Sequence, residues 1–159
     1  GRVALDEAEA EHLSGGLDWD RACDGQIAAT VAHLAQRHDR LAVLGFCMGG
    51  ALAVLAGLRL KDVDAVVAFY GLPPAESLRG QDMTAAFQGH FALHDDWITP
   101  DAVADFMNEV GSSVDAGEIY SYDAHHAFAN EQGKAYSPKD AELAWNRTRA
   151  FLGRLKKPR

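Results

Sequence analysis

The sequence is poor in cysteine and lacks metal-binding motifs. Cys23 and Cys47 are the only cysteines among 159 residues, so they could form one disulfide at most. They lie in segments of different character, and we therefore expect two free thiols, as in a reducing, cytoplasmic compartment. No HExxH motif and no paired CxxC motif is present. We accordingly expect no metal ion and no cofactor, although the sequence contains His90, His94, His125 and His126.

Long apolar runs and an excess of positive charge are also absent. The longest apolar region is interrupted by Arg59, Lys61 and Asp62, so no segment reaches the roughly 20 apolar residues of a membrane-spanning helix. The 23 acidic and 15 basic residues give a net charge of −8, which disfavours binding to nucleic acid or to an anionic membrane. We expect a soluble protein that binds neither nucleic acid nor a membrane.

What the sequence does contain is an alternation of two periodicities. Short apolar runs predict strands at residues 41–46, 65–70, 90–93 and 119–122. Helical spacing predicts helices over residues 18–38, after Cys47, over residues 100–110 and from Ser137 onward. The last helix is predicted to be lined by Leu143, Trp145, Thr148, Phe151, Leu152 and Leu155. Strands and helices in this order indicate an α/β fold with a mainly parallel sheet and helices on both faces.

The segment GFCMGG joins a predicted strand to a predicted helix. Gly45, Gly49 and Gly50 leave room for a tight turn that carries Cys47. Such a turn directs the first helical N–H groups, including that of Met48, at an anion forming beside the thiol. The helix N-terminus would also lower the pKa of Cys47. These features favour Cys47 as a nucleophile, with a buried small residue in a turn as the alternative.

A thiol nucleophile needs a base, and the base needs a carboxylate that orients it. The segment after the third predicted strand offers Asp95 or Asp96, and the segment after the fourth offers His125 or His126. The order nucleophile, acid, histidine is the one expected of an α/β-hydrolase.

These motifs resemble the dienelactone hydrolase family of α/β-hydrolases. Its members share a Gly-x-Cys-x-Gly-Gly elbow, an Asp four residues before a Pro, and a closing Gly-His-Ala-Phe signature, which GFCMGG, DWITP and HHAF match in order. YSPKDAELAWNRTRAFL is similar to the family's C-terminal helix. The resemblance implies Cys47 as nucleophile, Asp96 (four residues before Pro100) as acid and His126 as base. It implies a hydrolase that cleaves an ester or lactone through an acyl-cysteine intermediate.

Two departures concern the substrate. His125 stands where the family usually has Gly, and Asn130 stands where members that hydrolyse dienelactone carry an Arg for the substrate carboxylate. Because an amide cannot replace that charge, another ester, lactone or thioester is expected as the substrate. The candidates for the substrate pocket are Phe46, Trp97, His125, Phe128 and Asn130.

Family members also begin with several strands that this chain, which opens on Gly1, does not show. Those strands supply a second oxyanion N–H and a Glu near the thiol. We expect residues 1–159 to form a single, N-terminally truncated domain that corresponds to the C-terminal half of the sheet. The strand at residues 41–46 would then have an unpaired edge, which predicts self-association.

Two other hypotheses compete with a hydrolase. A glutamine amidotransferase also carries a Cys on a strand-to-helix turn, but it needs a late His-x-Glu pair that this sequence lacks. The other alternative is an inactive, truncated hydrolase-like domain that persists as an interaction module or exists only as an incomplete gene product. Cys23, on the apolar face of the first predicted helix, is expected to be a core residue.

Overall fold

The computed structural model describes residues 9, 12, 15–110 and 117–155. Its strands are β1 (Ala42–Phe46), β2 (Ala65–Phe69), β3 (Ala86–His94) and β4 (Glu118–His125). They form one sheet in the order β1-β2-β3-β4, and every pairing is parallel. This confirms the predicted α/β fold. The carboxyl ends of all four strands consequently meet at one edge of the sheet.

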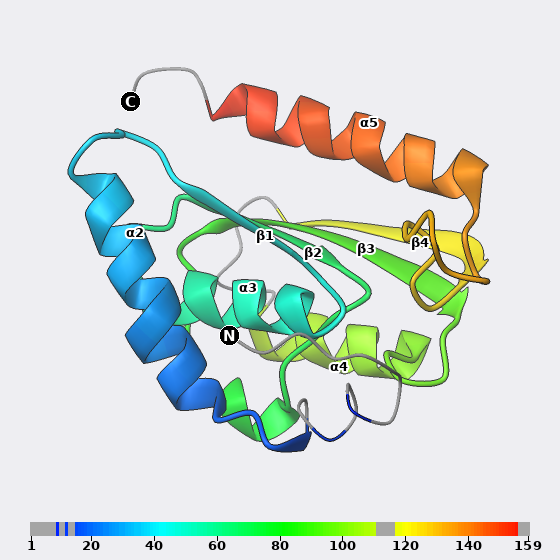
Figure 1. The fold of residues 1–159 in the computed structure, drawn as a ribbon, viewed down its shortest axis with the longest axis horizontal. Coiled ribbons are helices and arrows are strands. Elements are labelled where there is room, and N and C mark those ends of the chain that lie inside the picture. The colour runs from blue at the N-terminus through cyan, green and yellow to red at the C-terminus, as the bar shows by residue number, and fades with distance from the viewer. Residues whose placement is uncertain (1–8, 10–11, 13–14, 111–116, 156–159) are drawn as a thin grey trace.

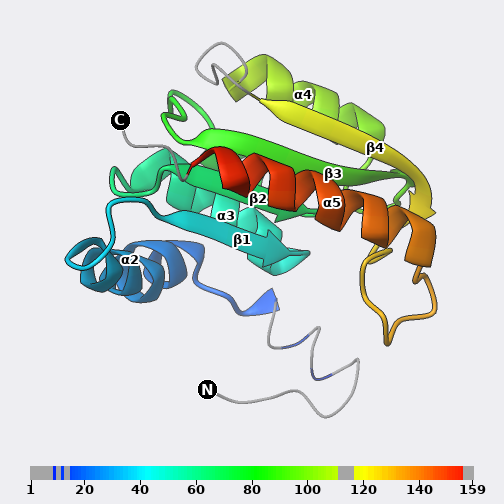
Figure 2. The same ribbon diagram turned by 90° about the horizontal axis from the view of Figure 1, so that it is seen from above.

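Helices cover both faces of this sheet (Figures 1 and 2). The π-helix η1 (Arg21–Ile27), α2 (Ala28–Ala35), α3 (Met48–Arg59) and α4 (Pro100–Val110) pack on one face, and α5 (Pro138–Arg154) packs on the other. A short 3₁₀ turn, η2 (Ala75–Ser77), lies between β2 and β3. The predicted helices are therefore confirmed, except that the first half of the first one is a π-helix.

Strands β3 and β4 are longer than the sequence pattern predicts, which gave residues 90–93 and 119–122. β3 begins at Ala86 and ends at His94, so the expectation of a short third strand is wrong. Its centre carries Gln88 and His90, whose polar side chains interrupt the apolar run although both are fully buried. Their hydrogen bonds explain how a central strand accommodates them. His90 contacts Gln88 and Thr148 through Nε2, at 3.0 Å each, and accepts from the Tyr122 hydroxyl at 2.7 Å through Nδ1.

The core is divided by the sheet into two clusters. Cys23 is fully buried in the cluster beneath α3 and α4, as predicted. The residues of α5 that are buried against the sheet are Ala141, Ala144, Thr148 and Phe151, whereas Leu143 is 40% exposed. The prediction for Leu143 is thus wrong, because the buried stripe of α5 follows the helical spacing 141, 144, 148, 151, which turns position 143 away from the sheet.

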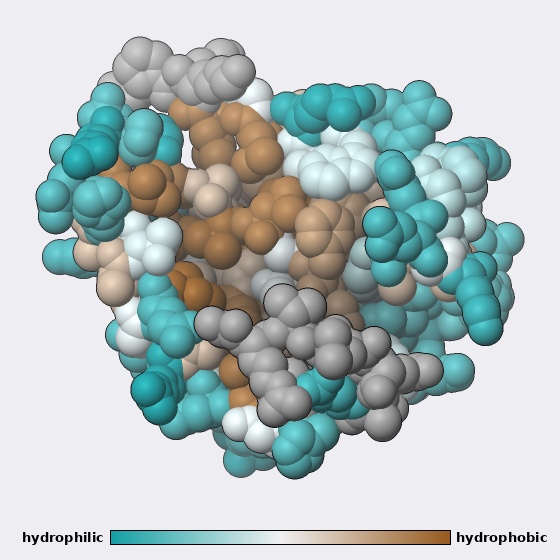
Figure 3. All heavy atoms as spheres, in the orientation of Figure 1, coloured by the Kyte–Doolittle hydropathy of each residue, from teal (hydrophilic) through white to brown (hydrophobic). Residues whose placement is uncertain are grey.

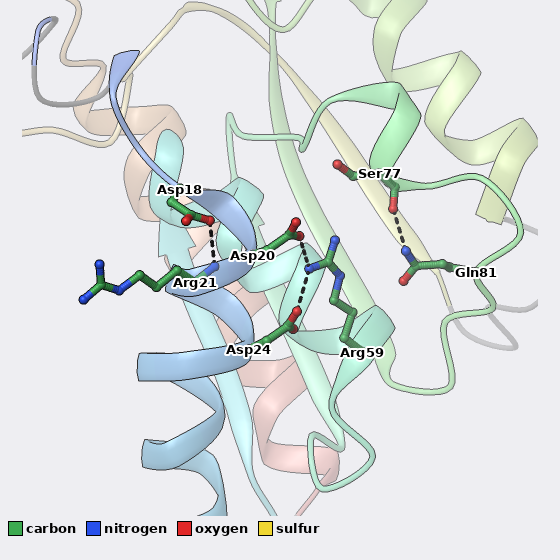
Figure 4. A network of polar contacts seen from close by, with 7 residues as sticks. All are labelled: Asp18, Asp20, Arg21, Asp24, Arg59, Ser77 and Gln81. Atoms are coloured by element: carbon green, nitrogen blue, oxygen red, sulfur yellow. Dashed lines mark hydrogen bonds and ion pairs between the residues drawn. The ribbon is translucent and has the colours of Figure 1, made fainter.

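A polar network joins η1 to α3 (Figure 4). The Arg59 guanidinium at the end of α3 donates hydrogen bonds to Asp20, at 2.7 Å, and to Asp24, at 3.2 Å. At the start of the same helical segment the backbone N–H of Arg21 donates to the Asp18 carboxylate at 2.9 Å. These contacts are solvent-exposed, so they contribute little to the stability of the fold.

Strand β1 lies at the edge of the sheet and, within the described ranges, pairs only with β2. A groove between α2 and β1 is lined by apolar residues that include Ile27, Val31, Leu34, Leu41 and Val43. Figure 3 shows hydrophobic residues gathered over this side of the molecule, between α2 and α5. Self-association through the edge stays a prediction. No helix in the described part of the chain is long and apolar enough to cross a membrane.

Candidate active site

Each of the four strands is followed at once by a residue of the site. Cys47 follows β1, Tyr70 follows β2, Asp95 follows β3 and His126 follows β4. The register explains why these residues meet. Phe46 pairs with Phe69, and His94 pairs with His125, so the next residue of each strand lies beside the next residue of its neighbour. A row of polar side chains thus crosses the carboxyl edge of the sheet.

Cys47 occupies a strained turn between β1 and α3. Its φ of 51° is in the left-handed region, and its backbone N–H donates to the carbonyl of Phe69 at 2.9 Å. A Cβ added to Gly45 would lie 1.9 Å from the carbonyl oxygen of Gly49, and one added to Gly50 would lie 3.0 Å from that of Phe69. The turn therefore requires glycine at position 45, and at position 50 a Cβ would press against the backbone of β2.

Gly49 differs from the other two glycines. A Cβ at this position would have open space around it. The expectation that all three glycines leave room for the turn is therefore wrong for Gly49, because a Cβ added there would contact no other part of the turn.

His126 connects the thiol to a carboxylate. Its Nε2 lies 3.2 Å from Sγ of Cys47, and its Nδ1 lies 2.7 Å from Oδ2 of Asp95. Since a carboxylate only accepts, Nδ1–H is the donor and Nε2 faces the thiol. The ring also makes T-shaped contacts with Tyr70 and Trp97, at centroid distances of 5.1 and 4.6 Å.

The carboxylate beside His126 is that of Asp95, which corrects the expectation of Asp96. The Asp95 side chain is fully buried, while Asp96 is exposed. Oδ1 of Asp95 also accepts the backbone N–H groups of Trp97 and Ile98, both at 2.9 Å. Counting back from Pro100 missed it. The signal in the sequence is instead the Asp that ends a strand and closes a turn on the N–H groups two and three residues later.

The contacts shift the pKa values of the thiol and the imidazole in opposite directions. The hydrogen bond from His126 lowers the pKa of Cys47, and the backbone N–H of Met48 adds to this against the opposing effect of partial burial. Burial by itself lowers the pKa of His126, but the hydrogen bonds to Cys47 and Asp95 outweigh it and raise that pKa. Both shifts favour a thiolate paired with an imidazolium.

Two cavities reach Cys47. The first, of about 350 Å³, is lined by Trp97, Met48 and His126, together with Gly15, Trp19, Ala51, Tyr70, Gly71, Leu72 and Ile98. The second, of about 320 Å³, is lined by Phe46, Tyr70, Ala127, Ala129, Asn130 and Glu131. Phe46, Trp97 and Asn130 therefore lie where the sequence placed them. Tyr70, whose pKa burial raises to about 12, was missed although it ends a predicted strand.

Two of the pocket candidates lie elsewhere. His125 is exposed, and its Nδ1 lies 3.0 Å from the carbonyl oxygen of His94, outside both cavities. Phe128 is fully buried among the rings of Phe69, Tyr70 and Tyr122. The expectation that they line the pocket is wrong, because His125 contacts the end of β3 and Phe128, in the turn after β4, packs into the core. Among the described residues, no group of three or more His, Cys, Asp or Glu side chains is placed to hold a metal ion.

Comparison with known proteins identifies the family. The sequence profile of the dienelactone hydrolase family matches residues 1–156. The chain belongs to the dienelactone hydrolase family. A probable 2-oxo-3-(5-oxofuran-2-ylidene)propanoate lactonase of Bradyrhizobium is 34% identical over 140 residues, which are 81% of this chain and 56% of that protein. A carboxymethylenebutenolidase of Pseudomonas strain P51 is 29% identical over 134 residues, which are 82% and 56% of the two chains.

Solved structures of the family show the same fold. A dienelactone hydrolase candidate from Klebsiella pneumoniae superposes with a TM-score of 0.76 at 24% identity, covering 94% of this chain and 68% of that one. The chain spans about half the length of these two curated family relatives.

Proposed function

We propose that the chain carries the catalytic triad of an ester or lactone hydrolase, with Cys47 as nucleophile, His126 as base and Asp95 as the residue that orients the base. The observation that supports it is the position of His126, whose two ring nitrogens contact the thiol and the buried carboxylate. This is the geometry that an activated nucleophile requires. Membership of a hydrolase family makes it the reaction class to test first.

The first half of the reaction forms an acyl-cysteine. The Cys47 thiolate attacks the carbonyl carbon, a C–S bond forms, and the carbonyl oxygen becomes an oxyanion beside the N–H of Met48 at the start of α3. Collapse of this intermediate breaks the C–O bond. The departing alkoxide takes the proton from Nε2 of His126 and leaves as an alcohol.

The second half returns the enzyme to its starting state. Neutral His126 removes a proton from water, and the hydroxide adds to the thioester carbonyl. The C–S bond then breaks, which releases a carboxylic acid and restores the thiolate paired with the imidazolium. Throughout, Asp95 accepts from Nδ1–H and keeps Nε2 directed at the reacting atoms.

The cavity with Asn130 argues for an uncharged substrate. Asn130 carries no charge, and its neighbour Glu131 adds a carboxylate to the same cavity. A substrate carboxylate there would meet a like charge and no cation among the described lining residues. We therefore propose an uncharged ester, lactone or thioester in place of a dienelactone.

Hydrolysis of p-nitrophenyl acetate tests the proposal. We expect turnover to fall by about a thousandfold or more in Cys47→Ala and in His126→Ala, as in other triads. Cys23→Ala serves as the matched control, because Cys23 is a fully buried core thiol that lines neither cavity. Undiminished turnover in Cys47→Ala would overturn the assignment. Equal reaction rates of Cys47 and an ordinary thiol with an ester probe would favour an inactive domain.

A further inference from the structure

The cavity with Met48 continues into a larger one that the catalytic chemistry does not use. This distal cavity, of about 530 Å³, lies against the segment from Leu72 to Arg79 and against α4. The two cavities share four lining residues, Trp19, Leu72, Trp97 and Ile98. They therefore form one groove, which begins at the thiol and runs past Trp97 to Phe106.

The groove is apolar where it leaves the thiol. Of the described residues that line its first cavity, none is an Asp, Glu, Lys or Arg. In the distal cavity Pro73, Leu78, Ala102 and Phe106 continue the apolar wall. The three charged lining residues, Arg79, Asp105 and Glu109, are all exposed. Beyond the Cys47–His126 pair, an apolar chain can thus lie along the groove without a buried charge against it.

Trp97 forms the wall at which the two cavities join. It is the most exposed of the large hydrophobic residues described, at 72%. Its backbone N–H is nevertheless fixed by Asp95 at 2.9 Å, and its ring lies edge-on to His126. An exposed indole held beside the catalytic base is a surface that a bound apolar group would cover.

From this we infer, resting on the proposed function, that the preferred substrate is an uncharged ester or thioester with a medium-length apolar acyl chain, which lies along the groove over Trp97. The acyl group stays on Sγ after the first step, so it is the part of the substrate that occupies the longer, apolar groove. The separate cavity with Asn130 and Glu131 receives the polar alcohol.

A chain-length series of esters tests the inference on the intact chain. We expect kcat/KM for p-nitrophenyl octanoate to exceed that for the acetate by at least about tenfold, because each methylene that becomes fully buried is worth about fourfold. In Ala102→Phe, which fills the distal cavity, the octanoate-to-acetate ratio should fall toward one. Leu143→Phe, at an exposed site on α5, is the matched control and should keep the ratio.

A second measurement does not depend on turnover. Alkyl methanethiosulfonates transfer an S-alkyl group to a thiolate, forming an S–S bond with Cys47 and releasing methanesulfinate. We expect the octyl reagent to modify Cys47 at least about tenfold faster than the methyl reagent, after correction by the same ratio for glutathione. Ala102→Phe and Trp97→Ala should both reduce this ratio.

The two measurements separate the two claims. Suppose that acetate turnover depends on Cys47 but that the octyl and methyl reagents modify Cys47 at equal corrected rates. This result would contradict the acyl groove and would still support the hydrolase. Absence of any ester turnover would overturn the hydrolase, while the methanethiosulfonate ratio would still decide the groove. A ratio that Ala102→Phe leaves unchanged would contradict the inference even if long chains react faster.

Discussion

Oδ2 of Asp95 lies 2.7 Å from Nδ1 of His126, in a position from which the carboxylate has no access to solvent. The other oxygen of the same carboxylate closes the turn through Trp97 and Ile98. One buried side chain therefore fixes the base and also the start of the segment that leads into α4. Removal of its charge should affect catalysis far more than removal of the exposed charge next to it.

Asp95→Asn and Asp96→Asn form a matched pair that tests this difference. We expect Asp95→Asn to lower kcat/KM for p-nitrophenyl acetate by about 100- to 10,000-fold, because the amide no longer enforces the tautomer that presents Nε2 to the thiol. Asp96→Asn should remain within about twofold, since an exposed charge is screened by water. Steady-state kinetics of both variants provide the measurement. A larger loss in Asp96→Asn would restore Asp96 as the acid.

The lowered pKa of Cys47 should be visible in its alkylation by iodoacetamide. The thiolate reacts, so the rate should reach half its maximum well below the value of about 8.5 for an ordinary thiol. His126→Ala removes the hydrogen bond that lowers this pKa, and the midpoint should therefore move to higher pH. Cys23, whose pKa burial raises to about 11, should stay unreactive in the native protein. An unchanged midpoint in His126→Ala would contradict the pairing.

The elbow predicts opposite outcomes for two neighbouring glycines. Gly45→Ala places a Cβ 1.9 Å from a backbone oxygen, so it should lower the free energy of unfolding by about 3 kcal/mol or more. Gly49→Ala meets open space within α3 and should be neutral or stabilising by up to about 1 kcal/mol. Urea unfolding followed by circular dichroism compares the two. Similar losses in both variants would show that the turn is packed differently.

His90 predicts a loss of stability in mild acid. Burial, with a smaller effect of the Arg147 charge, lowers its pKa to about 3, whereas an unfolded histidine titrates near about 6.5. Between these values the unfolded chain binds a proton that the folded chain refuses. The free energy of unfolding should therefore fall by roughly 1.4 kcal/mol per pH unit as the pH drops below about 6.

His90→Gln serves as the control for this pH dependence. Glutamine keeps hydrogen-bonding groups near Tyr122 and Thr148 but does not titrate. Its stability should depend less steeply on pH than that of the parent protein between about pH 6 and 4. Parallel curves for the two proteins would show that other groups cause the acid sensitivity.

The sequence predicted the fold and two of the three residues at the candidate triad because both leave local signals. Cys47 lies in a glycine-rich turn, and His126 precedes an Ala-Phe pair that the family shares. Asp96 was predicted from its spacing to Pro100, whereas β3 ends at His94, so that Asp95 is the residue directly after the strand. The walls of the groove come from five separate segments. Their contact is a property of the tertiary structure, which no single stretch of sequence encodes.

The acyl-cysteine is the species that the proposed mechanism requires above all others. Rapid mixing with p-nitrophenyl acetate, acid quenching and mass spectrometry of the peptides would detect it directly. We expect an acetyl group on the peptide with Cys47, formed at the rate of the p-nitrophenolate burst, and no such adduct in Cys47→Ala. An adduct that formed on another residue, or ester turnover that continued in Cys47→Ala, would contradict it.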